Sequence, residues 1–371
     1  MSFPVNWRQI LCFFLLVALQ FQVMASRFFD DESGDLDLSE HLLTHKGVLP
    51  VPMIITEPAL GTGLGVSAVY FQESISERLK KSDHFSPPNI SLLGGFKTEN
   101  GSKGVFGGAF RSFSQDQYRY LGALGKLSIN LDYYGPLNRP RKLNIEGLGT
   151  VQRFTSRINN SEWMIGGKYA YFDTDIQFAN PKPGFISDRQ LDLEIGRLGF
   201  LLSYDNRDNI LSPSKGILFE SEMAVARDWL GSSLDFEDYM AKIHAYLPVS
   251  DKFTLALRGD YKASSDNAPF FFLPYIDLRG IPAMRYQGES VALAEAELQW
   301  QFSYRWTALA FAGTGKTSGD NNVFVKSETA NNVGVGFRYL IASKLGLKAG
   351  LDIAKGPEDT AVYIQVGSAW R

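Results

Sequence analysis

The stretch ALAEAELQWQF, residues 292–302, alternates between two kinds of side chain. Every even position is apolar, and from residue 295 onward the odd positions carry Glu295, Glu297, Gln299 and Gln301. Successive residues of a β-strand point to opposite faces of its sheet. The pattern therefore predicts a strand with one apolar face and one face that meets water or other polar groups.

The same alternation recurs along the chain from Val51 to Arg371, where no convincing helix interrupts it. Asn100-Gly101 is a strong hairpin-turn signal between two of the alternating segments. One segment switches register near Gly196–Arg197, which we interpret as a β-bulge. The predicted strands number sixteen: 52–58, 62–73, 89–99, 103–113, 117–133, 143–156, 161–179, 191–206, 216–228, 235–249, 252–265, 288–304, 306–316, 330–342, 344–356 and 360–371.

Composition narrows the class of protein. The chain has 371 residues, of which 44% are hydrophobic, and a formal net charge of −3, so nothing suggests a nucleic-acid partner. Its single cysteine, Cys12, excludes an intramolecular disulfide and a cysteine metal site.

The N-terminal sequence has the features of an export signal. Arg8 precedes the apolar run ILCFFLLVALQFQVMA, and the small residues Val23 and Ala25 precede Ser26 in the spacing of a cleavage site. The run is closer to fifteen residues than to the ~20 of a membrane-spanning helix, so we predict a signal peptide over residues 1–25. The alternative is a membrane anchor.

A short acidic segment is expected to follow in the periplasm, over residues 26–50. Asp37 and Glu40 have capping-box spacing ahead of a short helix, and Gly47 is expected to end it. The remaining residues, 51–371, are predicted to form one domain.

Long strands in an even number, behind an export signal, favour an all-β fold in which an antiparallel sheet closes into a transmembrane β-barrel. A soluble β-sandwich is the alternative, but its outer faces would be mixed and wet. In this sequence one face is rich in Leu, Val, Phe and Trp, and the other carries charges of both signs, as an enclosed lumen would. The charges expected in the lumen are Arg258, Asp260, Arg338, Lys344 and Lys348.

Three patterns resemble ligand sites or active sites without completing one. AGTGKTSG, residues 312–319, has Ala310 where a phosphate loop needs its first glycine. His41 and His45 have helical spacing for a metal but no obvious third ligand, so a solvated helix end is the simpler interpretation. His244 has no GxSxG nucleophile elbow to support it. We therefore predict no catalytic site, no metal site and no cofactor.

The segment FFFLPYIDLRGIPAMRYQGE, residues 270–289, is too long and too apolar for an ordinary exposed loop. An LRG core followed by a strand like ALAEAELQW resembles the BamA/TamA superfamily of outer-membrane barrels, the bacterial surface antigen family. The similarity extends to DNRDNILSPSKGILFE (205–220), FAGTG (311–315), GVGFRY (334–339) and a final aromatic, Trp370. It covers residues from about 190 to 371 well.

The resemblance implies a sixteen-stranded barrel whose long loop, residues 266–287, folds into the lumen before the twelfth strand. Its arginine, Arg279, beside Gly280, would contact a carboxylate of the inner wall. The sequence departs from the family pattern at three positions, with Ile281 for an aromatic, Gly313 for an acid and Arg371 beyond the terminal aromatic. The carboxylate would then come from Asp352, Glu295 or Glu297. An exposed loop arginine is the alternative.

The resemblance also implies a function and a location. An integral protein of the outer membrane of a Gram-negative bacterium, monomeric and surrounded by lipid and lipopolysaccharide, would insert or translocate client proteins. Clients would add strands at the seam between the first and last strands. The family's POTRA domains have no room in this chain, which puts client handling in doubt. The alternatives are a loop-gated pore for small solutes and an outer-membrane enzyme acting on lipid.

Overall fold

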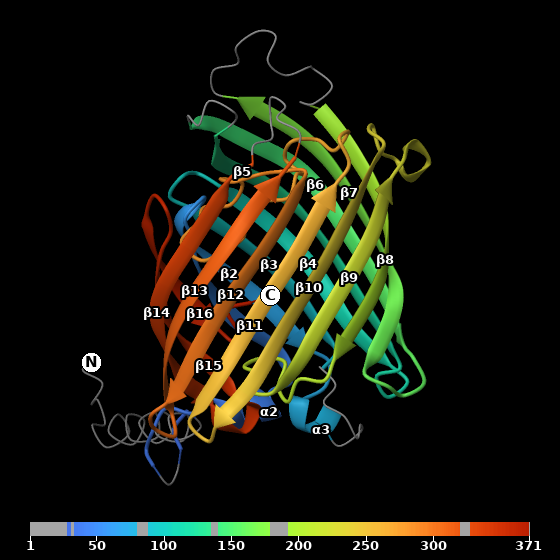
Figure 1. Ribbon diagram of the computed structural model, residues 1–371. Helices are drawn as coiled ribbons and strands as arrows, with labels where there is room; N and C mark the ends of the chain where they lie inside the picture. The colour runs from blue at the N-terminus through green and yellow to red at the C-terminus, as the bar shows by residue number, and fades with distance from the viewer. Residues whose placement is uncertain are drawn as a thin grey trace, which may run out of the picture.

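The computed structural model describes residues 28–30, 33–79, 88–134, 140–178, 192–319 and 327–370. The predicted signal peptide and Arg371 lie outside these residues. Figure 1 shows a barrel of tilted strands, with α2 and α3 at one end, which we call the turn end. The opposite end, where the long connection between β11 and β12 leaves the wall, is the loop end.

The barrel wall is one antiparallel sheet of sixteen strands joined in chain order, as the alternation predicted. The strands are β1 (Gly47–Glu57), β2 (Gly61–Phe71), β3 (Ile90–Thr98), β4 (Lys103–Phe113), β5 (Tyr118–Tyr133), β6 (Arg141–Arg157), β7 (Trp163–Phe178), β8 (Asp192–Asp205), β9 (Gly216–Ala226), β10 (Phe236–Ser250), β11 (Phe253–Ser264), β12 (Ser290–Gln301), β13 (Trp306–Ser318), β14 (Thr329–Ala342), β15 (Leu347–Lys355) and β16 (Thr360–Val366).

In the part of the chain that the structure describes, helices are few and short. The structure contains α2 (Ser39–Thr44), α3 (Ile75–Leu79) and the 3-10 turns η2 (Asp228–Leu230) and η3 (Ser343–Leu345). Within the described residues no helix is both long enough and apolar enough to cross a membrane.

The short N-terminal helix differs from its prediction. α2 begins after Leu38 and has no side-chain cap, so Asp37 and Glu40 do not form a capping box. Gly47 does not end the helix but opens β1, with φ +96°. The barrel wall therefore starts within the segment that was expected to precede it.

Residues 292–302 have the predicted strand geometry. On β12, Glu295 and Glu297 are 2% and 5% exposed and point into the barrel, whereas Leu298 and Trp300 are each 46% exposed on the outside. Because the outside of a monomeric soluble protein rarely carries a continuous apolar band, this alternation is typical of a membrane barrel.

The predicted bulge in β8 is wrong. β8 pairs with β7 in unbroken register through Gly196 and Arg197, and its pairing with β9 begins at Arg197. The polarity of the strand reverses instead. Toward the loop end Leu193 and Ile195 are buried on the inside, and Glu194 is exposed on the outside. Toward the turn end Arg197 faces inward and Leu198 faces outward. The polarity of the two faces therefore changes along the strand because their surroundings change, and the pairing register does not.

The same reversal extends over β5 to β7. At the loop end their inner face is a buried apolar cluster that includes Leu131, Leu143 and Ile176. Their outer face there is polar, with Lys126 Nζ 3.3 Å from Glu146 Oε1. The long strands of this sector therefore have an apolar outer face only in the half nearer the turn end.

The sheet does not close by a backbone ladder. β16 has 7 residues against 11 in β1, and no pairing joins the two strands among the described residues. The amide of Ile364 donates only to the side-chain hydroxyl of Thr56, at 3.4 Å. We call this β1–β16 boundary the seam.

Candidate functional site

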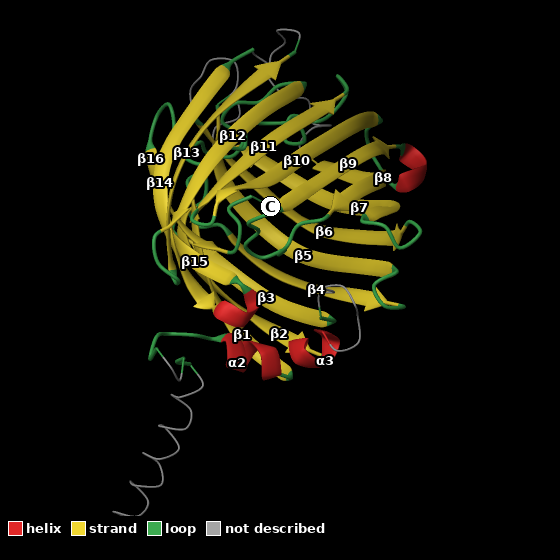
Figure 2. Cartoon of the chain, turned by 60° about the horizontal axis from the view of Figure 1, so that its bottom comes forward, coloured by secondary structure: helices red, strands yellow, loops and turns green. Residues whose placement is uncertain are grey.

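The connection between β11 and β12 enters the barrel and packs there as a folded unit. The Ile276 amide donates to the Tyr286 carbonyl at 3.0 Å, and the Gln287 side-chain amide donates to the Phe270 carbonyl at 2.9 Å. Phe270 and Ile276 are 1% and 0% exposed in two apolar clusters against the inner wall. Figure 2 shows loops inside the ring of strands. We call residues 265–289 the inward loop.

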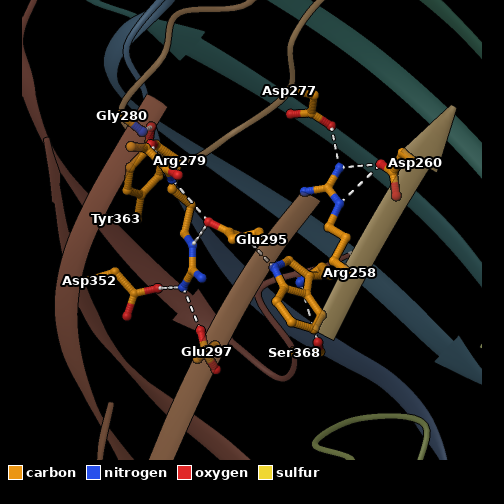
Figure 3. A network of polar contacts seen from close by, with 12 residues as sticks. Arg258, Asp260, Asp277, Arg279, Gly280, Glu295, Glu297, Asp352, Tyr363 and Ser368 are labelled. Atoms are coloured by element: carbon orange, nitrogen blue, oxygen red, sulfur yellow. Dashed lines mark hydrogen bonds and ion pairs between the residues drawn. The ribbon is translucent and has the colours of Figure 1, made fainter. Parts of the chain in front are cut away.

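Arg279, at the tip of the inward loop, lies among three carboxylates (Figure 3). Its Nε is 3.2 Å from Glu295 Oε1, and its Nη1 is 2.7 Å from Glu297 Oε2 and 3.0 Å from Asp352 Oδ2. All four side chains are at most 7% exposed. The surrounding carboxylates hold the pKa of Arg279 above its ordinary value against the opposing effect of burial. The structure thus brings together every residue that the resemblance assigned to the loop contact.

Four further groups complete this cluster. The sequence placed Arg338 in the lumen and marked Trp370 as the final aromatic, but it assigned neither of them, nor Phe311 or Asn332, to the loop contact. Arg338 bonds both oxygens of Asp352, at 2.5 and 2.9 Å. The Phe311 ring lies under the Arg279 guanidinium, 3.4 Å from Cζ to centroid. Asn332 donates to Glu295 at 3.0 Å, and Trp370 Nε1 donates to Glu295 at 2.5 Å. Such charge-assisted contacts fix position as well as energy.

Gly280 has a structural requirement of its own. Its φ is +85°, and a Cβ at this position would lie 2.8 Å from the Gly356 nitrogen and 3.1 Å from the Ala354 carbonyl. The Gly280 amide donates to the Tyr363 hydroxyl at 2.7 Å. Only glycine allows both this backbone conformation and this approach.

The other charges that the sequence predicted for the lumen do not all lie there. Arg258 pairs with Asp260 at 2.6 Å and reaches Asp277 of the inward loop at 3.3 Å (Figure 3). Lys348 lies in the lumen and donates to the Thr307 hydroxyl at 3.3 Å.

Lys344, expected in the lumen, is instead exposed on η3, where it pairs with Glu40. The structure places it there because β15 begins only at Leu347, beyond the 3-10 turn. Trp370 also lies on another side than strand alternation predicts, since its even position, six residues after Ile364, would share the outer face with Ile364. The chain turns at Gly367 (φ +81°) into the lumen, and Trp370 is 5% exposed there.

At the loop end, the inward loop contacts both sides of the seam. Arg285 Nη2 lies 2.6 Å from Glu358 Oε1, and the Tyr286 hydroxyl donates to the same oxygen at 2.5 Å. Glu358 belongs to the β15–β16 turn. On the other side, Glu57 at the end of β1 accepts a hydrogen bond from the Ala283 backbone. The loop therefore spans a boundary that the backbone does not close.

At the turn end, the N-terminal segment makes a second connection. Arg305, in the β12–β13 turn and 5% exposed, pairs with Asp30 at 3.1 Å, Asp35 at 3.3 Å and Asp37 at 2.9 Å. The Leu38 amide donates to the Ile341 carbonyl at 2.7 Å. Since this segment leads directly into β1, it ties the first strand to the opposite flank of the seam.

Asp37 is the least exposed of the three carboxylates that pair with Arg305. Burial alone would raise its pKa, but hydrogen bonds from Ser343, Ser39 and Arg305 outweigh burial and hold the pKa well below its usual range. The signal that could have revealed the contact is the acidic run at 30–37, whose charges need a basic partner somewhere on the barrel.

Taken together, these features define the class: a sixteen-stranded barrel with an apolar outer band, an arginine-anchored inward loop and an unpaired first-to-last seam. An Omp85 superfamily domain matches residues 110–271. The chain is therefore similar to the Omp85 superfamily over these residues, and its fold is the barrel that the sequence resemblance predicted.

Solved structures share this fold. BamA from Haemophilus ducreyi, lacking POTRA domains 1–3, matches with a TM-score of 0.61 and 11% identity over 87% of this chain and 69% of that chain. CdiB from Escherichia coli matches with a TM-score of 0.59 and 10% identity over 85% of this chain and 61% of that one. CdiB from Acinetobacter baumannii gives 0.56 and 10% over 86% and 59%. The chain thus spans about two thirds of the length of these proteins. No curated protein sequence matches it.

Proposed function

We propose that this barrel inserts or translocates client proteins in the outer membrane of a Gram-negative bacterium. The turn end would face the periplasm, and the loop end would face outward. Large apolar side chains on the outer wall support a membrane setting, with Leu64, Val66 and Leu93 between 58% and 70% exposed. Outer-membrane lipid and client chains would be the partners of a monomeric barrel, and its role would not be enzymatic.

The observation that carries this proposal is the seam. An unpaired strand edge is a template on which another chain can add strands. Here the two edge strands lie next to each other without a backbone ladder, while every other neighbouring pair in the wall is laddered. Opening the seam would therefore cost side-chain contacts but no backbone hydrogen bonds of a β-ladder.

β1 contains a reason for the missing ladder. Pro50 and Pro52 lack an amide hydrogen, and a proline within a sheet places its nitrogen on the side away from the paired strand. β1 pairs with β2, opposite Ala68 and Val66 at these positions. The two nitrogens therefore face β16, and this edge of β1 lacks a donor at both positions.

Paired cysteines test the seam. Thr56→Cys with Ile364→Cys would cross-link β1 to β16, and Ile54→Cys with Leu64→Cys would cross-link the laddered pair β1 and β2. If the seam is the client edge, the first disulfide should stop growth or client assembly in cells that depend on the protein. The second should leave both intact. Equal activity of the two oxidised variants would refute a role for the seam.

A gated pore for small solutes is the second candidate. A charged lumen cavity of about 360 Å³ near the turn end favours it, whereas the inward loop obstructs the other end. Single-channel recording in planar bilayers separates the candidates, since a pore predicts steady conductance that increases when the loop is released.

A further inference from the structure

The inner wall of β4 to β7 carries an apolar cavity of about 310 Å³, and Phe106, Ala123, Val151 and Phe172 are among its lining residues. Leu127 also lines it and remains 38% exposed although it points into the lumen. The size is within the range of small-molecule sites, which are mostly apolar and concave. An open apolar surface on the inside of a barrel is a candidate site for an apolar ligand.

The charged cavity of about 360 Å³ continues the apolar one toward the turn end. Arg153 lines the charged cavity, and Val151, two residues away on the same face of β6, lines the apolar one. On β5, Leu121 and Ala123 stand in the same relation. The two cavities therefore adjoin along the inner wall, and we call the pair the chamber, with an apolar half and a polar half.

The polar half is charge-balanced. Its lining contains four arginines and four carboxylates: Arg119, Arg153, Arg157, Arg207, Glu162, Asp205, Asp208 and Glu220. Arg153, nearest the apolar half, pairs with Glu220 at 3.2 Å and retains a side-chain exposure of 34%. Lys242 holds the other oxygen of Glu220 at 2.6 Å. Guanidinium donors and carboxylate acceptors are thus presented side by side.

The two ends of the chamber differ. At the loop end Phe172 contacts Phe272 of the inward loop, with ring centroids 5.9 Å apart, so the loop covers that end of the apolar half. At the turn end the polar half is bordered by the turns that carry Glu162 and Asn206. A molecule entering from the turn end would place its apolar part deep and its polar part near the mouth.

We propose that this chamber binds a single-chain zwitterionic phospholipid, with the acyl chain between β4 and β7 and the headgroup among the arginines and carboxylates. Guanidinium recognises phosphate, and the neighbouring carboxylates suit an ammonium group. A fatty acid would bring only negative charge to a balanced lining. An uncharged hydrocarbon would leave the polar half without a partner. The site is separate from the seam and does not depend on the function proposed for it.

The test is native mass spectrometry of the purified full chain with 1-palmitoyl-lysophosphatidylethanolamine as the probe. Wild-type protein should retain one tightly bound probe. Ala123→Trp, which fills the apolar half, should weaken binding at least tenfold. Val105→Trp is the matched control, since Val105 precedes the lining residue Phe106 on β4 but is 62% exposed on the outer wall, and it should bind like wild type. Val151→Phe gives a second, smaller filling of the cavity, and a heat-modifiable gel shift reports folding of each variant.

The headgroup is tested separately. Arg153→Gln should weaken the lysophospholipid about tenfold and leave hexadecanol unchanged, and palmitate should bind more weakly than the zwitterion. Equal loss in Ala123→Trp and Val105→Trp, or no loss in Ala123→Trp and Val151→Phe, would assign the bound lipid to the outer wall. Absence of a bound probe in the wild type would mean that the chamber is filled by the chain itself or stays empty, and either result overturns the proposal.

Discussion

Arg279 Nη1 lies 3.0 Å from Asp352 Oδ2, and the Asp352 side chain is completely buried. Arg338 reaches the other oxygen of the same carboxylate at 2.5 Å. One aspartate on β15 therefore holds both the inward loop and the neighbouring strand β14. The loop is anchored by the barrel wall close to the seam, because β15 is the strand beside β16.

Arg279→Ala should loosen the inward loop. Removing one partner of a buried ion pair costs about 3–5 kcal/mol, because the other charges stay buried without it. We expect a lower unfolding midpoint and faster proteolysis within residues 265–289. Arg279→Lys should recover little, since an ammonium cannot reproduce the fork of contacts to three carboxylates.

Arg227→Ala is the control for that experiment. Arg227 pairs with Glu237, whose side chain is 65% exposed, and exposed pairs contribute about 1 kcal/mol or less. Asp352→Asn should resemble Arg279→Ala, and the double variant should add little to either single one. Fully additive losses would show that the two residues act independently, leaving Glu295 and Glu297 as the partners to test.

Replacing Pro50 and Pro52 by alanine should tighten the seam. The change restores two amide donors on the edge of β1 that faces β16, so a partial ladder can form. We expect slower hydrogen exchange of β16 amides and, if clients use the seam, reduced activity. Pro248→Ala, a proline on β10 away from the seam, is the control. Unchanged exchange in β16 would show that the prolines do not keep the seam unpaired.

The two faces of β12 should respond differently to a charge. Leu298→Arg places a guanidinium against lipid and should cost about 2–4 kcal/mol near the bilayer centre. Gln299→Arg, one residue on, places it in the lumen and should cost much less. Reversible unfolding from lipid vesicles in guanidinium chloride measures both. Equal losses would mean that the outer face of β12 does not meet lipid.

The N-terminal segment should detach in acid. The pKa of Asp37 in the folded protein lies below that of an unfolded chain, about 4. Its stabilising contribution is therefore complete above pH 4 and is lost as the pH falls below that value. A nitroxide at Ser33 should become mobile in that range. In Asp37→Asn the acid transition should be reduced or absent. An unaltered transition would assign it to Asp30 or Asp35.

The fold could be predicted because strand alternation is a local property. The pattern of residues 292–302 requires only that one face meets lipid and the other does not, and both faces of β12 follow it. β8 was interpreted wrongly at Gly196 because alternation reports polarity, and a bulge and a change of surroundings alter polarity in the same way. Only the unbroken pairing with β7 distinguishes them.

Part of the candidate site could be predicted from the sequence. The Arg-Gly pair directed attention to Arg279, and alternation placed the carboxylates on the inner wall, but neither could rank three acids that lie within 3.2 Å of one side chain. Trp370 continued an outward-facing pattern until the chain turned at Gly367, and nothing local specifies that turn. Contacts between distant segments, such as Arg305 with Asp37, have no periodic signal at all.

The docking of the N-terminal segment has a mechanical consequence. Arg305 and the Leu38–Ile341 hydrogen bond hold this segment on the far flank of the seam, ahead of the point where the chain enters β1. Tension applied to the chain before Asp30 would reach the β12–β13 turn first, and β1 only after these contacts break. The N-terminal contacts would therefore bear the force before the edge strand β1 does.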